Sequence, residues 1–363
     1  MDASGHTPHH NRFSFTHRHE LGALSPIEAL SPAWESTLYL LFRPFKRRLW
    51  ITLSIVCIFL GGGTSTAAFQ WGFGALPIDF DARGVLFRIQ AVMAAHASLM
   101  VLAVVVSLGF VLSLIYVRCV LRFVLIEAVI KQDLAPREAW HSLESYGRSY
   151  FLWLLGIVGA LTVALGAAAI ASFRFLGFLR ESGSPEWLPF VLLVTELVAV
   201  VGIGLLIAIV ITLTDDLVAP LVYSEQISLP VAWGMFWKLV RRDSAPFFFY
   251  VVLRLAVGMG ISVGALFVLF PVLMGLSAGA LVSAAAVILA LSAVGLVWAW
   301  NPLTLVLGAF ALTIFTTLLF SLLSVIGMPG QVYLQNYGVR FIASRVPSLG
   351  ALCRTGAAQA RGD

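Results

Sequence analysis

The chain has 363 residues, of which 60% are hydrophobic and only 11% carry a charge. A soluble domain carries about 25% charged residues, so this composition excludes an ordinary soluble protein and indicates one that lies in a bilayer. The net charge of +5 does not indicate nucleic acid as a partner, because Lys and Arg gather at the ends of apolar runs. Three cysteines without a CxxC pair predict neither a disulfide framework nor a metal site, and no cofactor is expected.

Residues 1–30 differ from the rest of the chain because they are rich in histidine and hold no long apolar run. Clustered imidazoles suit transition metals, but no carboxylate or thiol spacing completes a site here. We therefore expect a disordered tail, and the apolar core of a signal peptide is missing from it. The histidines of this tail are His6, His9, His10, His17 and His19.

Six apolar runs are long enough to cross a bilayer, which takes about 20 residues of helix. We expect a seventh run, 281–300, to be re-entrant or packed within the bundle, with a seventh crossing as the alternative. The sequence thus predicts an all-α integral membrane protein, a six-transmembrane-helix bundle in which seven helices are possible. The expected spans are 49–69, 91–117, 150–173, 187–212, 246–275 and 303–328.

Basic residues are concentrated before the first span, in the second and fourth loops, and after the sixth span. Because cytoplasmic loops carry the excess of Lys and Arg, we expect these segments and both termini in the cytoplasm, with the protein in the inner membrane of a bacterium. An even number of spans follows. The expected division is the tail at 1–30, a polytopic membrane domain at 31–340 and a basic cytoplasmic tail at 341–363.

A short element recurs on the expected cytoplasmic side, as "SPAW" (31–34), "APREAW" (135–140) and "LPVAW" (229–233). Proline suits the first turn of a helix, and tryptophan favours the membrane interface. Each element therefore predicts an amphipathic helix lying at the interface. The expected interfacial anchors are Trp34, Trp140, Trp233 and Trp237.

The segments before two of these prolines resemble each other. "RFVLIEAVIKQ" (122–132) parallels "DDLVAPLVYSEQ" (215–226), and "MPGQVYLQNYG" (328–338) is a weaker third version. Such repeats predict a duplicated hairpin of two spans. The alternative is that any short interfacial helix tends to look this way.

Three stretches that overlap these segments, 122–153, 215–250 and 329–338, resemble a family of uncharacterised polytopic membrane proteins of bacteria and haloarchaea. That family is a domain of unknown function, similar in layout to the membrane domain attached to some glycerophosphodiester phosphodiesterases. The resemblance covers most of residues 40–340 and implies a six-helix α bundle in the cytoplasmic membrane, with no established activity. The positions that match the family pattern are Asp216, Pro220, Tyr223, Gln335, Tyr337 and Gly338.

Charged residues within or beside the apolar runs are the main candidates for a site, because they are costly there. Glu196 lies within the fourth span and Arg254 within the fifth, while Asp215 and Asp216 follow the fourth span. We expect Arg254 to pair with Asp215 or Asp216. Glu196 has no evident partner and suits either proton coupling or a hydrogen bond to a neighbouring helix.

Pro220 cannot donate to the carbonyl of Asp216, four residues earlier, so we expect a helix break at Asp216. Broken helices form cation sites in some transporters. The plainer alternative is an interfacial kink whose carboxylates bind Arg241, Arg242 or Arg254.

The stretch "GLSAG" (275–279) fits the nucleophile elbow of serine hydrolases, but it follows an apolar helix and no histidine occurs after His141. We therefore expect a non-enzymatic protein with no catalytic residue and a structural or assembly role, with the lipid bilayer and other membrane proteins as partners. The alternative is a small transporter or lipid-handling permease that uses the intramembrane carboxylates and Arg254.

Overall fold

The computed structural model describes residues 23–43, 45–60, 97–133, 136–181, 185, 187–293 and 302–361. These residues form helices and short turns, and no strand occurs among them, so the predicted all-α class is confirmed. The elements in chain order are α1 (Leu30–Phe42), α2 (Arg47–Leu60), α5 (Ala97–Lys131), α6 (Pro136–Glu181), α7 (Trp187–Leu213), the π-helical turn η1 (Thr214–Val218), α8 (Ala219–Glu225), α9 (Leu229–Arg242), α10 (Ser244–Ala293), α11 (Pro302–Ala343) and α12 (Pro347–Arg361).

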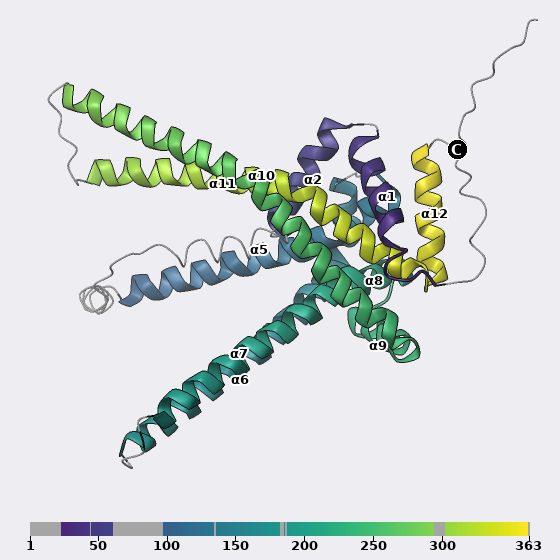
Figure 1. Cartoon of the computed structure of the whole chain (residues 1–363), viewed down its shortest axis with the longest axis horizontal. Coiled ribbons are helices and arrows are strands. Elements are labelled where there is room, and N and C mark those ends of the chain that lie inside the picture. The colour runs from purple at the N-terminus through teal and green to yellow at the C-terminus, as the bar shows by residue number, and fades with distance from the viewer. Residues whose placement is uncertain are drawn as a thin grey trace, which may run out of the picture.

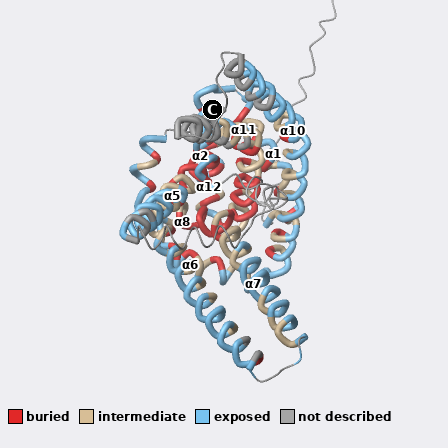
Figure 2. The backbone as a smooth tube through the Cα atoms, turned by 90° about the vertical axis from the view of Figure 1, so that its left-hand side faces the viewer, coloured by how far each residue is buried: buried red, intermediate tan, exposed pale blue. Residues whose placement is uncertain are grey.

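The short helices gather into a compact region that we call the hub (Figure 1). α1 and α2 pack on α11, and α12 packs on α5, α8 and α11. Almost all of the buried side chains lie in this region, as the buried segments of Figure 2 show. The hub consists of α1, α2, η1, α8, α9 and α12, with residues 119–131 of α5, 136–153 of α6, 244–254 of α10 and 328–343 of α11.

The remainder of each long helix leaves the hub as an apolar arm. Figure 1 shows the arms diverging, with α10 beside α11 in one direction, α5 in a second and α6 with α7 in a third. Their side chains are largely exposed, for example Phe173 at 80% and Phe267 at 77%. The described structure thus differs from the predicted bundle, because its helices are packed together at one end only.

Five of the described helices are long and apolar enough to cross a membrane, which fits a multi-pass membrane protein. The predicted spans at 187–212, 246–275 and 303–328 lie within α7, α10 and α11. The first predicted span, 49–69, is described only to Leu60 at the end of α2, and its remainder lies outside the described residues. The predicted count of six is therefore not reached among the residues described.

Three of the predicted segments are parts of longer helices. α5 runs beyond residue 117 to Lys131, and α6 joins the "APREAW" element and the third span in one helix. The apolar run at 281–300 is not a separate segment either, since residues 281–293 extend α10 and the rest lies outside the described residues. A charged residue ends a membrane span where its side chain must reach water. Arg122 does not end α5, because its side chain binds Asp216 inside the hub.

The predicted tails also begin and end elsewhere. Ser25 N–H donates to Glu28 Oε2 (2.8 Å) and Glu28 N–H donates to Ser25 Oγ (3.2 Å), a capping box ahead of α1. The boundary at residue 30 therefore falls after a capped turn and at the first residue of α1, and residues 1–22 lie outside the described residues. The tail at 341–363 is not separate from the membrane domain, because α11 continues to Ala343 and α12 buries Leu349 and Cys353 in the hub.

Candidate functional site

The two aspartates lie in the π-helical turn η1 between α7 and α8. Pro220 has no N–H to give to the carbonyl four residues back, and the helix widens here: Ala219 N–H donates to Thr214 O, five residues back. The predicted helix break is thus a π turn that keeps the helical path and turns both carboxylates into the hub. Such turns are frequent at functional sites.

Asp216 is almost fully buried, with 1% of its surface exposed. Its Oδ1 accepts a hydrogen bond from Arg122 Nη2 (3.0 Å), and its Oδ2 accepts one from Arg254 Nε (2.5 Å). Tyr250 Oη lies 3.4 Å from the same Oδ2 and donates to it. The expected pairing of Arg254 with one of the aspartates is therefore present, and Arg122 is a second cation that the sequence did not single out.

Asp215 completes the cluster. Tyr150 Oη donates to its Oδ1 at 2.5 Å, and Arg122 Nε lies 3.5 Å from the same oxygen, an ion pair without the geometry of a hydrogen bond. Two carboxylates face two guanidinium groups, so the cluster is neutral as a whole. A buried ion pair of this kind contributes little net stability while intact, but removing one partner leaves an uncompensated charge.

The cluster joins the two segments whose sequences resemble each other. Arg122 precedes Gln132 by ten residues, and Asp216 precedes Gln226 by ten. Both glutamines have left-handed backbone angles, with φ of 55° and 52°, and they are the only such non-glycine residues described. Matching positions of the two segments thus carry opposite charges that bind each other.

Aromatic rings surround the cluster in an unbroken series of contacts. Tyr150 packs on Phe123 and Trp153, with centroid distances of 6.3 and 5.9 Å. Tyr250 stacks on Tyr337 (4.9 Å) and on a phenylalanine of α11 (4.6 Å). The series is Phe123, Tyr150, Trp153, Trp233, Phe236, Phe247, Phe341, Tyr250 and Tyr337. These rings keep water from the charges and so strengthen the ion pairs.

α11 closes the cluster with a glycine. A Cβ added to Gly338 would lie 2.5 Å from Asp216 O and 3.0 Å from Tyr250 Oη, so only glycine allows this approach. One residue earlier, Tyr337 is fully buried against Tyr250. The two segments that carry the family resemblance, around Asp216 and around Gln335–Gly338, therefore meet at one place.

α11 also fixes α1 through polar contacts. Asn336 Nδ2 donates to Thr37 Oγ1 (3.1 Å), and Arg340 Nη2 donates to Ser36 Oγ (2.5 Å). Ser36 Oγ is also 3.3 Å from Gln132 Nε2, at the end of α5. The hub is thus held by polar contacts as well as by its apolar core.

Glu196 is not part of the cluster. It is half-buried on the α7 arm, 19 residues before Asp215, which is about 28 Å along a helix. No hydrogen bond or ion pair joins it to another described residue. The four predicted polar residues therefore separate into a cluster of three and a distant carboxyl.

The expected tryptophan anchors occupy different environments. Trp34 and Trp237 are about half exposed, at 55% and 50%. Trp233 is partly buried and stacks on Trp153 at 6.1 Å, so it belongs to the aromatic series. Trp140 is partly buried near the start of α6. Their position at a membrane interface stays a prediction.

"GLSAG" lies in the middle of α10, where Ser277 Oγ donates to Met274 O (3.1 Å). A nucleophile elbow needs a strand, a sharp turn and a helix, which this continuous helix does not supply. Among the described residues, no group of three or more His, Cys, Asp or Glu side chains comes together in a way that could hold a metal.

A separate polar cavity of about 330 Å³ lies where α1, α2, the end of α5 and α12 meet. Arg43, Lys46 and Lys131 line it. Lys46 Nζ lies 3.9 Å from Asp133 Oδ1, and Lys131 is paired with Glu127. Gln132 forms its buried wall, and the Oε1 of this side chain has no hydrogen-bond donor. The cavity therefore presents positively charged side chains and one hydrogen-bond acceptor, Gln132 Oε1, that has no donor.

No curated protein and no solved structure matches the chain. The model of a family of unknown function (DUF7544) matches residues 24–352, which include the ion cluster, all of the described arms and the hub except for residues 353–361 of α12. The chain is a member of this family.

Proposed function

We propose that this chain is a non-enzymatic assembly protein of the bacterial inner membrane. In this proposal the hub holds the ends of the long helices at the cytoplasmic face, and the arms receive other membrane segments. The observation that carries the proposal is the contrast in packing: the hub buries a neutral ion cluster, while the arms leave large apolar side chains uncovered.

The orientation rests on the distribution of basic residues. The hub exposes Lys238, Arg241 and Arg242 on α9 and a further group around the start of α2. Lys and Arg favour the cytoplasmic side of a membrane. Because α1 and α12 both belong to the hub, the first and the last described helices lie on that side in this proposal.

We also propose that the hub arose by duplication. The paired left-handed glutamines, the proline four residues after each (Pro136 and Pro230) and the Arg122–Asp216 pair support this origin. One copy carries Arg122 and the other carries Asp216 at the matching position, so neither copy can take the place of the other. The hub therefore assembles in a single arrangement.

The transporter alternative is less well supported, because the polar residues that it needs are either paired with arginines or far apart. Asp215 and Asp216 are neutralised by Arg122 and Arg254, and Glu196 is far from them. A carboxylate held by two guanidinium groups is a poor site for a passing cation, because the ion would have to displace buried partners.

The experiment places a photo-crosslinking amino acid on an arm, at Val201 or Phe267, in the chain expressed in its native membrane. Trp237 on the hub surface is the control position; it is 50% exposed, against 61% for Val201 and 77% for Phe267. We expect discrete protein adducts from the two arm positions at higher yield than from the control. Lipid adducts alone from both arm positions would contradict the assembly role.

The basic cavity favours a second candidate, the handling of anionic lipids. Arg43 and Lys46 suit a phosphate, and the free Gln132 Oε1 suits a hydroxyl or ammonium of the same headgroup. Native mass spectrometry of the purified chain tests it: the double change Arg43→Ala and Lys46→Ala should reduce retained anionic lipid, and Arg242→Ala should not. Equal retention would exclude this candidate.

A further inference from the structure

The α6 arm carries a face of small residues that ends in a charge. Ala160, Ala164, Ala167, Ala171 and Arg174 follow one another at spacings of four and three residues, so they share one side of the helix, and all are exposed. Small residues at this spacing let a second helix approach closely. Such a stripe alone does not identify a partner.

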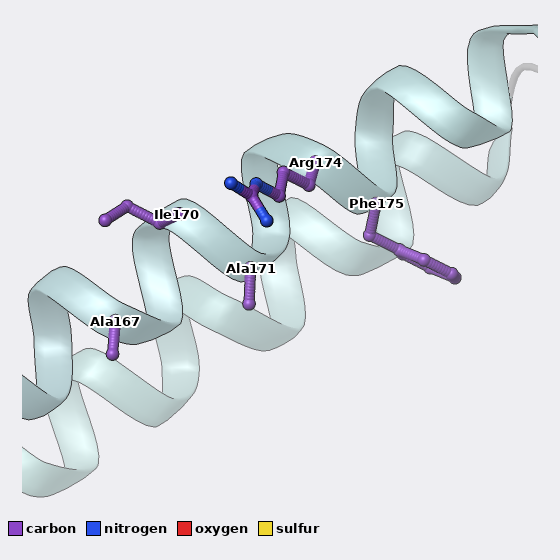
Figure 3. A pocket seen from close by; sticks show the side chains of 5 residues that line it. All are labelled: Ala167, Ile170, Ala171, Arg174 and Phe175. Carbon is purple, nitrogen blue, oxygen red and sulfur yellow. The ribbon is translucent and has the colours of Figure 1, made fainter.

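Figure 3 shows the end of this face. Ala167, Ile170, Ala171, Arg174 and Phe175 follow one another along this stretch of α6, and together they line a shallow open cavity of about 630 Å³. All five side chains come from α6, so no other described helix lines this cavity. α6 and α7 touch at few points, which leaves both helices of the arm free to contact a further helix.

Two opposite charges on this arm lie at similar distances from its tip. Arg174 is seven residues before the end of α6, and Glu196 is nine residues after the start of α7. At 1.5 Å per residue these are about 10 and 14 Å from the respective helix ends. Neither side chain has an ion pair or hydrogen bond to another described residue, although an unpaired charge is costly within lipid.

We propose that a second copy of this chain supplies the missing partners. Two copies with the same orientation in a membrane are related by a two-fold axis along the membrane normal, which keeps every residue at its own depth. Arg174 of each copy then pairs with the second copy's Glu196, and the two α6–α7 arms form a four-helix bundle with the alanine face at its contact. A foreign helix would need its own matched pair at this depth.

This inference rests on the proposed assembly role and names the partner of one arm, the α6–α7 arm. It is tested with the full chain in liposomes, labelled with a donor or an acceptor dye, by energy transfer between copies. Arg174→Glu alone and Glu196→Arg alone each place like charges opposite each other. We expect each to weaken dimer formation by about tenfold or more.

Mixing the two variants is the decisive step. In the mixed dimer the two substituted side chains face each other with their charges exchanged, and the unchanged Glu196 of one copy faces the unchanged Arg174 of the other. Both contacts again join opposite charges, so energy transfer should return to the unmodified level. A pair formed within one chain cannot be rescued by mixing. Arg242→Glu, an exposed charge reversal on α9 of the hub, is the matched control and should leave energy transfer unchanged.

The outcomes separate this inference from the assembly role itself. No recovery on mixing, or no energy transfer in the unmodified chain, overturns the self-association. If Val201 still forms adducts with other proteins in the native membrane, the assembly role stands with a foreign partner. If it forms lipid adducts only, both proposals fail.

Discussion

The hub and the arms are built from the same apolar residue types, yet they are packed in opposite ways. Leu217 in the hub is fully buried, whereas Leu197 on the α7 arm is 63% exposed. In water an exposed apolar surface of this extent would aggregate, so the arms need lipid or protein around them. The hub is held by its own contacts, and the arms depend on their surroundings.

Polar contacts mark the same division. The hub joins distant parts of the chain through Asp216, Ser36 and Asn336. The hydroxyl groups on the arms instead return to carbonyls of their own helix, as Thr162 does to Val158 and Thr195 to Val191. Side chains on the arms therefore add little to the tertiary structure, and substitutions should act very differently in the two regions.

The largest effect is expected from Asp216→Asn. The variant leaves the buried guanidinium groups of Arg122 and Arg254 with one carboxylate in place of two. We expect this to lower the free energy of unfolding by about 3–5 kcal/mol. Reversible unfolding in lipid bicelles measures this loss. Glu35→Gln, at an exposed position of α1, is the control and should change stability by less than about 0.5 kcal/mol. Equal effects from the two variants would show that the cluster does not hold the hub.

A matched pair of leucines compares the regions directly. Leu217→Ala should cost about 2–5 kcal/mol, because it opens a cavity in the hub. Leu197→Ala removes the same atoms from an exposed arm and should cost less than about 0.5 kcal/mol. The same unfolding measurement applies, and a larger loss from Leu197 would mean that the arms pack on one another.

Gly338→Ala tests the close approach of α11 to the π turn. The added Cβ meets Asp216 O at 2.5 Å, so we expect a loss of about 1–3 kcal/mol. Gly234→Ala is the control, since nothing lies within 4 Å of a Cβ there and alanine favours the helix. Stability of Gly338→Ala equal to that of the unmodified chain would contradict this packing.

The smallest effect concerns the two left-handed glutamines. Gln226→Gly should raise stability by about 1 kcal/mol, because glycine adopts a φ of 52° without strain. Gln132→Gly relieves the same strain but loses the donation from Nε2 to Val129 O (2.6 Å) and to Ser36, so its gain should be smaller. A loss of stability in Gln226→Gly would show that the left-handed cap is not formed.

The sequence predicted what depends on local pattern. Long apolar runs located α7, α10 and α11, and charge alone indicated that Arg254 would pair with an aspartate. The missing N–H of Pro220 marked the position of the π turn, although it predicted a break there. Each of these features can be predicted from residues that are adjacent in the sequence, or from the free-energy cost of placing a charge in lipid.

The remainder of the site depends on contacts between distant segments. Arg122 is 94 residues from Asp216, and no local signal connects them, except that they occupy matching positions of the two similar segments. Tyr150 and Tyr250 look like ordinary interfacial aromatics until the fold brings their hydroxyl groups to the aspartates. The divergence of the arms was not predictable either. An apolar composition indicates that a helix lies in lipid, but it does not indicate which other helices it packs against.

The most direct test of the account is a comparison of lipid contact in two settings. A photoactivatable lipid is used to label the purified chain in liposomes and the same chain in its native membrane, and labelling is measured around Phe267 on α10 and across residues 328–342 of the hub. We expect the hub segment to stay unlabelled in both settings, and the α10 arm to be labelled in liposomes but protected in the native membrane. Equal labelling of the α10 arm in the two settings would contradict it.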